Sequence, residues 1–243
     1  MHEEIIWADY FAGAVPAGTI FDLTVQNLRG IASVSNSSQQ NLNPGAELCL
    51  IGLVAYFEAF CKNHFASMVN ICPELVENLQ AANRDVSVKA VDLLNVAAPL
   101  SASLGFLIVD RFDFGTPKSV NSLYMDLIRQ TPFSKEEAET YGKILDDRNL
   151  LVHHGGIFTP RYAKERFIER ELGRSRLFID SLLVTKEQFV VASTFVLEIS
   201  RKMRVSTQSA LRNFLRERRQ GLSAERGKAV EALAWKDDLD ETA

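Results

Sequence analysis

The sequence lacks the features that mark several common classes of protein. It holds three cysteines, Cys49, Cys61 and Cys72, an odd number without a Cys-x-x-Cys pair. We therefore expect neither a disulfide framework nor a cysteine-rich zinc site, and we predict buried thiols. The chain also has no Gly-Lys-Ser/Thr phosphate loop, no His-Glu-x-x-His zinc motif and no Gly-x-Ser-x-Gly nucleophile turn. Three frequent kinds of active site are thereby excluded.

Long apolar runs are scarce as well. The run from Leu94 to Val109 comes nearest to the roughly 20 residues that span a bilayer, but it contains Pro99 and three Ser or Asn residues. Residues 1 to 4 give no basic start to a signal peptide, and the apolar segment Ile5 to Val15 is broken by Asp9. We therefore expect a cytoplasmic protein without a membrane segment.

The overall composition is that of a globular protein, but its charge is unevenly distributed. The chain has 243 residues, 47% hydrophobic and 24% charged, which suffices for a full core. Its net charge is -4, yet residues 160 to 228 carry 16 Lys and Arg against 8 Asp and Glu. This basic stretch could attract a polyanion such as RNA, or it could form solvated helix faces, and the sequence leaves both open.

Apolar residues recur at helical spacing through most of the chain, so we predict an all-α protein built as an antiparallel helical bundle. We divide it into an N-terminal arm and linker (1 to 43), a helical domain (44 to 204) and a C-terminal helical extension with an acidic tail (205 to 243). The expected helices are Thr19 to Ala32 with an end near Gly30, Pro44 to Val69, Pro73 to Ala82, Val86 to Val109 with a break or kink at Pro99, Lys118 to Gln130, a helix between Ser134 and Gly155, Pro160 to Gly173, Thr185 to Arg204 with a continuation through Arg219, and a peripheral helix after Gly221.

Two of these helices are expected to form much of the core. Pro44 to Val69 is the central one, and Val86 to Val109 is apolar enough for burial on most sides. Leu177 to Val184 has the brief apolar character of a strand or extended strap, and Thr185 with Gln188 has the spacing of a capping box. The inward residues are expected to be Leu48, Ile51, Ala55, Phe57, Phe60 and Phe65 in the central helix, and Val120, Leu123, Leu127 and Ile128 in Lys118 to Gln130.

The helix that ends before Gly155 and Gly156 carries a dense group of polar side chains, and the two glycines can take the left-handed conformation that stops a helix. Arg148 and His153 are five residues apart, about 500° of rotation or a net 140°, so they do not share a face of an ideal helix. Asn149 and His153 are four residues apart and therefore share a face of the helix. A site that uses both Arg148 and His153 therefore needs a distorted helix end or a second copy of the chain.

These residue types suit a reaction at phosphorus. An imidazole, with an ordinary pKa of about 6.5, can move protons at neutral pH, and a guanidinium can hold two phosphate oxygens. RNA could then supply its own 2'-hydroxyl as nucleophile, with His153 moving the proton and Arg148 stabilising the charged transition state, without a metal. The alternative is structural, because cations in a last helical turn complement the helix dipole and Arg148 can pair with a neighbouring carboxylate.

A second group of side chains lies along the central helix. Glu58, Cys61 and His64 follow one another at steps of three and could meet one metal ion. A buried thiol beside a surface carboxylate and imidazole is the commoner arrangement, so we assign no metal and no cofactor to the chain.

The string from Arg148 to His153 resembles the Arg-x4-His signature of the HEPN superfamily (higher eukaryotes and prokaryotes nucleotide-binding), in which a polar residue commonly follows the Arg. The likeness includes Val152-His153 followed closely by glycines, and the long early helix with Glu58. It covers residues 44 to 204. We refer to Arg148 through His153 as the Arg-x4-His motif.

The resemblance implies a metal-independent endoribonuclease of a toxin-antitoxin, abortive-infection or antiviral defence system. Members of that kind use the motif from both protomers of a homodimer and leave a 2',3'-cyclic phosphate. Carried over, Arg148 and His153 are catalytic, Asn149 supports them, and Glu58 is an acidic residue facing the motif. The implied partners are RNA, with tRNA as one candidate, a second copy of the chain, and an antitoxin or defence-system protein.

Two other readings stay open. The superfamily contains inactive members, so the chain could be an interaction or nucleotide-binding subunit of a defence or toxin-antitoxin complex. It could also be a simple helical scaffold in which Arg148 pairs internally.

In the toxins that an antitoxin nucleotidyltransferase modifies, a Tyr stands two residues after the His. Gly155 occupies that place here, so we do not expect regulation by that route.

Overall fold

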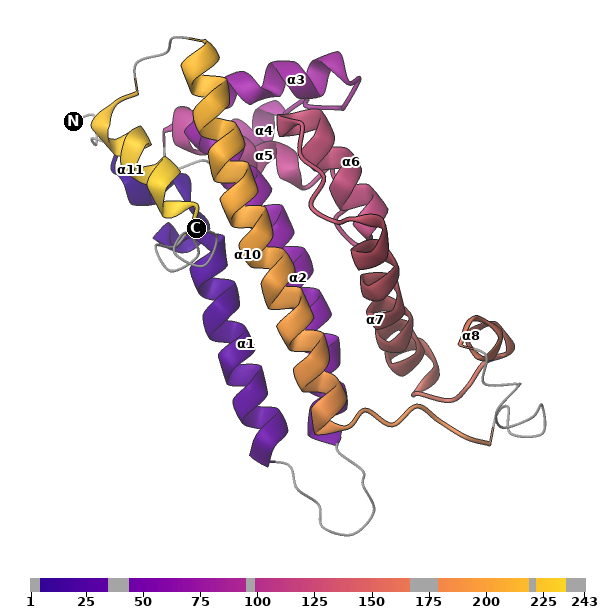
Figure 1. Ribbon diagram of the computed structural model, residues 1–243. Coiled ribbons are helices and arrows are strands. Elements are labelled where there is room, and N and C mark those ends of the chain that lie inside the picture. The colour runs from indigo at the N-terminus through magenta and orange to yellow at the C-terminus, as the bar shows by residue number, and fades with distance from the viewer. Residues whose placement is uncertain (1–4, 35–43, 95–98, 167–178, 219–221, 235–243) are drawn as a thin grey trace. The chain divides into compact units, whose positions relative to one another are not determined.

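The computed structural model describes residues 5–34, 44–94, 99–166, 179–218 and 222–234. In these ranges the chain forms ten α-helices and short 3-10 turns, and its one β interaction is an isolated bridge. The all-α prediction is confirmed for this part of the chain. The α-helices, labelled in Figure 1, are α1 (Ala17–Val34), α2 (Pro44–Ile71), α3 (Val76–Ala81), α4 (Ala90–Leu94), α5 (Leu104–Val109), α6 (Pro117–Ile128), α7 (Lys135–His154), α8 (Pro160–Glu165), α10 (Lys186–Glu217) and α11 (Ala224–Ala232).

The chain divides into two compact units, and three long helices contribute to both. The first unit comprises residues 1–23, 57–134 and 198–243, and the second comprises 24–56 and 135–197. Helices α1, α2 and α10 therefore each pass from one unit to the other. The domain boundaries that we expected after residues 43 and 204 stay a prediction.

The first unit has an aromatic core around the second half of α2. Phe21 stacks on Phe60 with 5.3 Å between ring centroids, and Phe65 meets Tyr124 edge to face at 5.6 Å. The Tyr124 hydroxyl donates a hydrogen bond of 2.8 Å to the carbonyl of Cys61. All three cysteines are buried and free, as predicted.

The start of the N-terminal arm, residues 5–16, belongs to this unit and contacts α11. Residues 5–16 contain two 3-10 turns, η1 (Trp7–Tyr10) and η2 (Ala12–Ala14). The backbone N–H of Trp7 donates to Glu225, and Arg226 donates from Nε to the carbonyl of Ile71 at 2.7 Å. Helix α11 thus contacts both the arm and the end of α2.

The second unit joins the C-terminal half of α1 to the beginnings of α2 and α10. Arg29 donates to the hydroxyls of Ser193 and Thr194 at 2.8 and 2.6 Å. The capping box at the start of α10 is confirmed: Gln188 N–H donates to Thr185 Oγ1 at 3.2 Å, and Thr185 N–H donates to Gln188 Oε1 at 2.8 Å.

Three expectations about helices were wrong. Helix α1 continues past Gly30 to Val34, because a glycine within a helix lowers its stability without ending it. The segment Val86 to Val109 is not helical as far as expected: the chain is interrupted at Pro99, as predicted, but the structure describes only α4, the 3-10 turn η4 (Leu100–Ala102) and α5 there, and residues 95–98 lie outside the described part. Its first part is not buried either, since Leu94 is 85% exposed.

The inward residues were predicted well for α6 and incompletely for α2. Phe57, Phe60 and Phe65 are buried, but Leu48 and Ala55 are exposed. Apolar residues occur on all sides of α2, so periodicity could not identify its buried face. The inward residues of α6, Val120, Leu123, Leu127 and Ile128, are all buried as predicted.

Helix α2, rather than the run from Leu94 to Val109, meets the length and composition expected of a membrane span. An 18-residue window in it has a mean hydropathy of 1.4, and 44% of that window is buried. A core helix of a soluble protein passes the same test, so this finding is weak evidence for a membrane segment.

Candidate functional site at the end of α7

Helix α7 ends at the two glycines identified in the sequence. Gly155 and Gly156 have positive φ angles of 58° and 81°. The N–H of Gly156 donates to the Leu150 carbonyl at 3.1 Å, which satisfies one of the free carbonyls of the last turn. The helix therefore stops directly after His153 and His154, and both imidazoles are exposed.

The chain then turns back and forms α8. Thr159 caps this short helix by accepting a hydrogen bond from Tyr162 N–H, and Pro160 occupies its first position. The segment around Ser181 contacts the turn, because Leu182 N–H donates to the Gly156 carbonyl at 2.8 Å. The expected strap is thus present here as a single bridge, while residues 167–178 lie outside the described part of the chain.

Helix α8 is anchored to α7 by polar and apolar contacts. The hydroxyl of Tyr162 donates to Asp147 Oδ1 at 2.8 Å, and Arg166 makes an ion pair with the same carboxylate. Arg166 also donates to the Lys143 carbonyl at 2.9 Å. Beneath these contacts Leu150, Phe158 and Tyr162 form a small buried cluster. Within the second unit, these contacts hold α8 on the last turns of α7.

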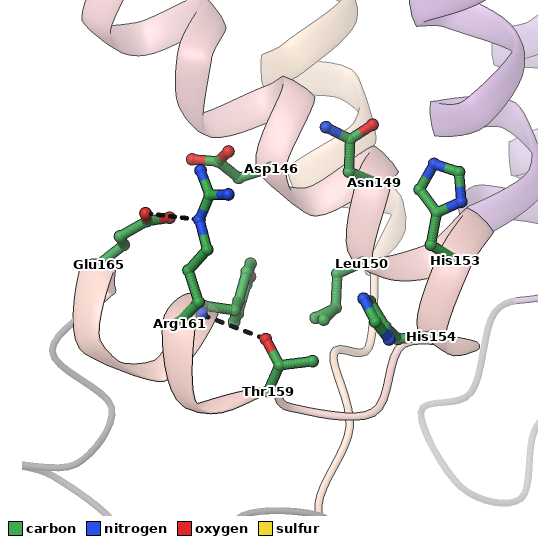
Figure 2. Close-up of a pocket in the computed structure, with 9 residues that line it drawn as sticks. Asp146, Asn149, Leu150, His153, His154, Thr159, Arg161 and Glu165 are labelled. Carbon is green, nitrogen blue, oxygen red and sulfur yellow. Dashed lines mark hydrogen bonds and ion pairs between the residues drawn. The ribbon is translucent and has the colours of Figure 1, made fainter.

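A pocket of about 150 Å³ lies between the end of α7 and α8. Figure 2 shows the α7 side chains on one wall and Arg161 on the opposite wall, with its guanidinium directed toward Asp146. The Nε of Arg161 also pairs with Glu165 at 3.0 Å. The lining residues are Asp146, Asn149, Leu150, His153, His154, Thr159, Arg161, Tyr162 and Glu165.

Burial and neighbouring charges change the acid–base character of the pocket. Burial raises the pKa of Asp146, and the charge of Glu165 raises it further, while Arg166 and Arg161 act in the opposite direction. The hydrogen bond and charge of Glu165 raise the pKa of Arg161, with a smaller contribution from Asp146. A carboxyl group with a raised pKa beside two imidazoles gives the pocket three groups capable of proton transfer.

The structure brings some of the predicted site residues together and leaves others apart. Asn149 and His153 line the same pocket, in agreement with their spacing of four on one helix face. Arg148 does not line it. Its Nε is buried and meets no hydrogen-bond acceptor among the described residues. Glu58 is half-buried on α2 in the first unit, whereas the Arg-x4-His motif belongs to the second, so its role stays a prediction.

Seven pocket residues were not predicted to have a part in the site: Asp146, Leu150, His154, Thr159, Arg161, Tyr162 and Glu165. The sequence does carry a signal for Asp146, because Asp146, Asn149 and His153 are spaced at i, i+3 and i+7 on one helix face. Arg161 gave no such signal. Its position depends on the turn at Gly155 and Gly156, which brings α8 back onto α7.

The second polar group on α2 is part of the core. His64 is buried, and its Nε2 lies 2.8 Å from Thr207 Oγ1. The Thr207 hydroxyl donates to the Met203 carbonyl at 2.6 Å, so Nε2 of His64 carries the proton in their contact. Burial lowers the pKa of His64 to about 3, and the charge of Arg204 lowers it as well. In the described part of the chain, no group of three or more His, Cys, Asp or Glu residues could hold a metal ion.

The basic stretch from 160 to 228 is partly neutralised by ion pairs. Seven of its Lys and Arg residues pair with carboxylates in the described ranges, five of them with acids that lie outside the stretch. Arg204, for example, pairs with Asp22 at 2.8 Å. The balance of charge along the sequence therefore overstates the free positive charge on the folded chain.

Comparison with known proteins adds no further evidence. The sequence matches no family model, and no curated protein or solved structure matches it. The resemblance to the HEPN superfamily therefore depends on the Arg-x4-His motif and on its place in the chain.

Proposed function

We propose that the chain is a metal-independent endoribonuclease of the HEPN type. The observation that carries the proposal is the pocket of about 150 Å³ at the end of α7, which His153 and Asn149 line together with Arg161. An exposed imidazole, an amide that can orient it and a guanidinium can together supply the proton transfer and charge stabilisation for cleavage of RNA by its own 2'-hydroxyl. The finer fold that we propose is an antiparallel HEPN bundle with an N-terminal arm and peripheral C-terminal helices.

In this reaction the 2'-oxygen of a ribose attacks the adjacent phosphorus, and the bond from phosphorus to the 5'-oxygen of the next nucleotide breaks. His153 takes the proton of the 2'-hydroxyl, and the departing 5'-oxygen receives a proton from water. The products are a 2',3'-cyclic phosphate and a 5'-hydroxyl. Asn149, four residues before His153, orients the imidazole.

Arg148 has a different position, and we propose that it acts from the second protomer of a homodimer. It does not line the pocket of its own chain, and its Nε has no acceptor among the described residues. A guanidinium of this kind can stabilise the charged transition state in a site completed by two copies of the chain. Glu58 is proposed as an acidic residue facing the motif.

The biological setting that we propose is a toxin-antitoxin, abortive-infection or antiviral defence system in the cytoplasm. RNA is the substrate, with tRNA as one candidate, and an antitoxin or defence protein is a further partner. If tRNA binds the stretch from 160 to 228, binding should weaken as salt concentration rises, because each phosphate contact releases counterions. A flat salt response would remove this assignment.

The test is cleavage of total RNA by the purified protein in EDTA, with the product ends identified. We expect 2',3'-cyclic phosphate ends, and we expect His153→Ala or Arg148→Ala to lower the rate by roughly 10²- to 10⁴-fold. Lys164→Ala is the matched control, because Lys164 is exposed on α8 and does not line the pocket. Cleavage that EDTA stops, or that both variants retain, would contradict the mechanism.

A second candidate is an inactive HEPN subunit that binds a nucleotide or a partner protein. The two carboxylates of the pocket, Asp146 and Glu165, repel phosphate, so they favour the form of this candidate that binds a partner protein. For such a subunit we expect no cleavage of any RNA, and association with the partner that survives His153→Ala.

A further inference from the structure

The pocket contains the guanidinium of Arg161, which can exchange its present partner, the Glu165 carboxylate, for another anion. Arg161 binds Glu165 through Nε at 3.0 Å, four residues further along α8, and its side chain is 85% exposed. Exposed ion pairs on helices contribute little to stability, so the competition from water and other anions is strong. A phosphate, which can accept two parallel hydrogen bonds from a guanidinium, is a better partner than a single carboxylate oxygen on Nε.

Arg161 also has the position that a phosphate-binding group requires. Its guanidinium extends from α8 toward α7, on the side of the pocket opposite His153 and Asn149 (Figure 2). A phosphodiester between the two walls would meet the guanidinium on one side and the imidazole on the other. Arg148, which does not line the pocket, cannot take this part within its own chain.

The backbone that carries Arg161 is fixed relative to α7. The next residue, Tyr162, is buried and hydrogen-bonded to Asp147 at 2.8 Å, and its ring stacks on Phe158 with 5.7 Å between centroids. Arg166 pairs with the same Asp147 carboxylate. The cation is therefore presented by a rigid element, while its own side chain stays free to exchange partners.

We infer that Arg161 binds the scissile phosphate of RNA in this pocket, on the same protomer as the His153 that acts on the 2'-hydroxyl. The inference rests on the proposed function, and it adds a phosphate-binding residue that the Arg-x4-His motif does not contain. Glu165 holds the guanidinium when the pocket is empty and competes with the phosphate. Asp146, on the opposite wall, orients the guanidinium toward α7.

The experiment measures binding and cleavage separately. Binding uses a fluorescent 2'-O-methyl RNA hexamer, which has the phosphates of RNA but no free 2'-hydroxyl and so is not cut. We expect Arg161→Ala to weaken its binding by roughly 10- to 100-fold, as for a lost charge-assisted hydrogen bond. We expect Glu165→Gln to strengthen binding, because it removes both the competitor and a repelling charge. Lys164→Ala, the control on the same helix, should change binding no more than about 2-fold.

Cleavage distinguishes failure of the inference from failure of the proposed function. If His153→Ala abolishes cleavage while Arg161→Ala binds and cuts like the wild type, the inference is overturned and the proposed function stands. If the wild type cuts no RNA but binding follows the expected order, the proposed function fails and Arg161 remains a phosphate-binding residue. Equal loss of binding in Arg161→Ala and Lys164→Ala would show a general charge effect and would also overturn the inference. Circular dichroism and thermal unfolding establish that each variant is folded.

Discussion

The imidazoles of His64 and His153 both lie on helices, yet they differ in burial and in contact partners. His64 is enclosed in the first unit, with Thr207 as its hydrogen-bond partner and aromatic rings stacked on it. His153 is exposed in the last turn of α7, beside a pocket with carboxylates and a guanidinium. The residue type alone does not indicate a site, because burial and partners decide what an imidazole can do.

The difference has a direct chemical meaning. With its pKa lowered to about 3, His64 is neutral at physiological pH, and its contact with Thr207 fixes the tautomer. It cannot exchange protons with a ligand while it is buried. His153 and His154 are open to solvent at the border of a pocket, where a proton can be passed to or from a bound molecule.

The largest effect is expected at the closest packing in the first unit. A Cβ at Gly105 would lie 2.0 Å from the Ala66 carbonyl oxygen, a backbone atom that cannot move aside. Gly105→Ala should therefore lower the free energy of unfolding by about 3 kcal/mol, as severe overpacking does. Urea unfolding followed by circular dichroism measures this change.

Gly142→Ala is the matched control in the second unit. Gly142 lies within α7, and an added Cβ would meet nothing within 4 Å. Alanine is favoured over glycine in a helix, so this variant should be more stable by roughly 0.5 to 1 kcal/mol. Equal effects of the two substitutions would contradict the difference in packing between Gly105 and Gly142.

The buried state of His64 predicts a dependence of stability on pH. Its pKa is lowered to about 3 in the folded protein, and the unfolded chain has the ordinary value of 6.5. Below pH 6.5 the unfolded state binds a proton that the folded state does not, so stability falls as pH falls toward 3. Between pH 7 and pH 5 this amounts to a loss of about 2 kcal/mol.

His64→Gln tests whether this histidine is the cause. Glutamine does not titrate and can still donate to Thr207, so the free energy of unfolding of the variant should change less between pH 7 and pH 5. The measurement is a series of urea unfolding curves over that range. An identical pH dependence in variant and wild type would exclude His64 as the source.

A smaller effect is expected where α8 is anchored. Tyr162→Phe removes the hydrogen bond to Asp147 but leaves the ring and the ion pair between Arg166 and Asp147. We expect a loss of about 1 kcal/mol in the free energy of unfolding. Tyr56→Phe is the control, because Tyr56 is exposed on α2 in the same unit. A loss as large as that of Gly105→Ala would mean that α8 contributes more to stability than its few contacts indicate.

The helical pattern was predictable because it depends on local signals. Pro44 begins α2, Thr185 and Gln188 cap α10, and Gly155 ends α7, each through interactions with residues nearby in sequence. For Val86 to Val109 the break at Pro99 was predicted, but apolar composition indicated long buried helices and the structure describes short, partly exposed segments. A run of apolar residues without a clear helical period predicts neither a helix nor its length.

Only the α7 side of the candidate site was predictable, because it depends on spacing within one helix. The spacing of Asn149 and His153 on one helix face follows from the rotation per residue, and the structure places both at the pocket. The separation of Arg148 from them follows from the same arithmetic. The opposite wall of the pocket did not follow, because the side chains of α8 reach the site only through the turn after α7.

By itself, the sequence determined that this protein is helical, where α2, α7 and α10 begin, and which α7 residues share a face. Helix caps, glycine stops and periodicity act over a few residues, so they can be read without the fold. Only the tertiary structure decided that His64 is a buried, neutral core residue and that Arg161 and His153 line the same pocket. Burial and contacts between segments distant along the chain depend on packing, and no local pattern specifies them.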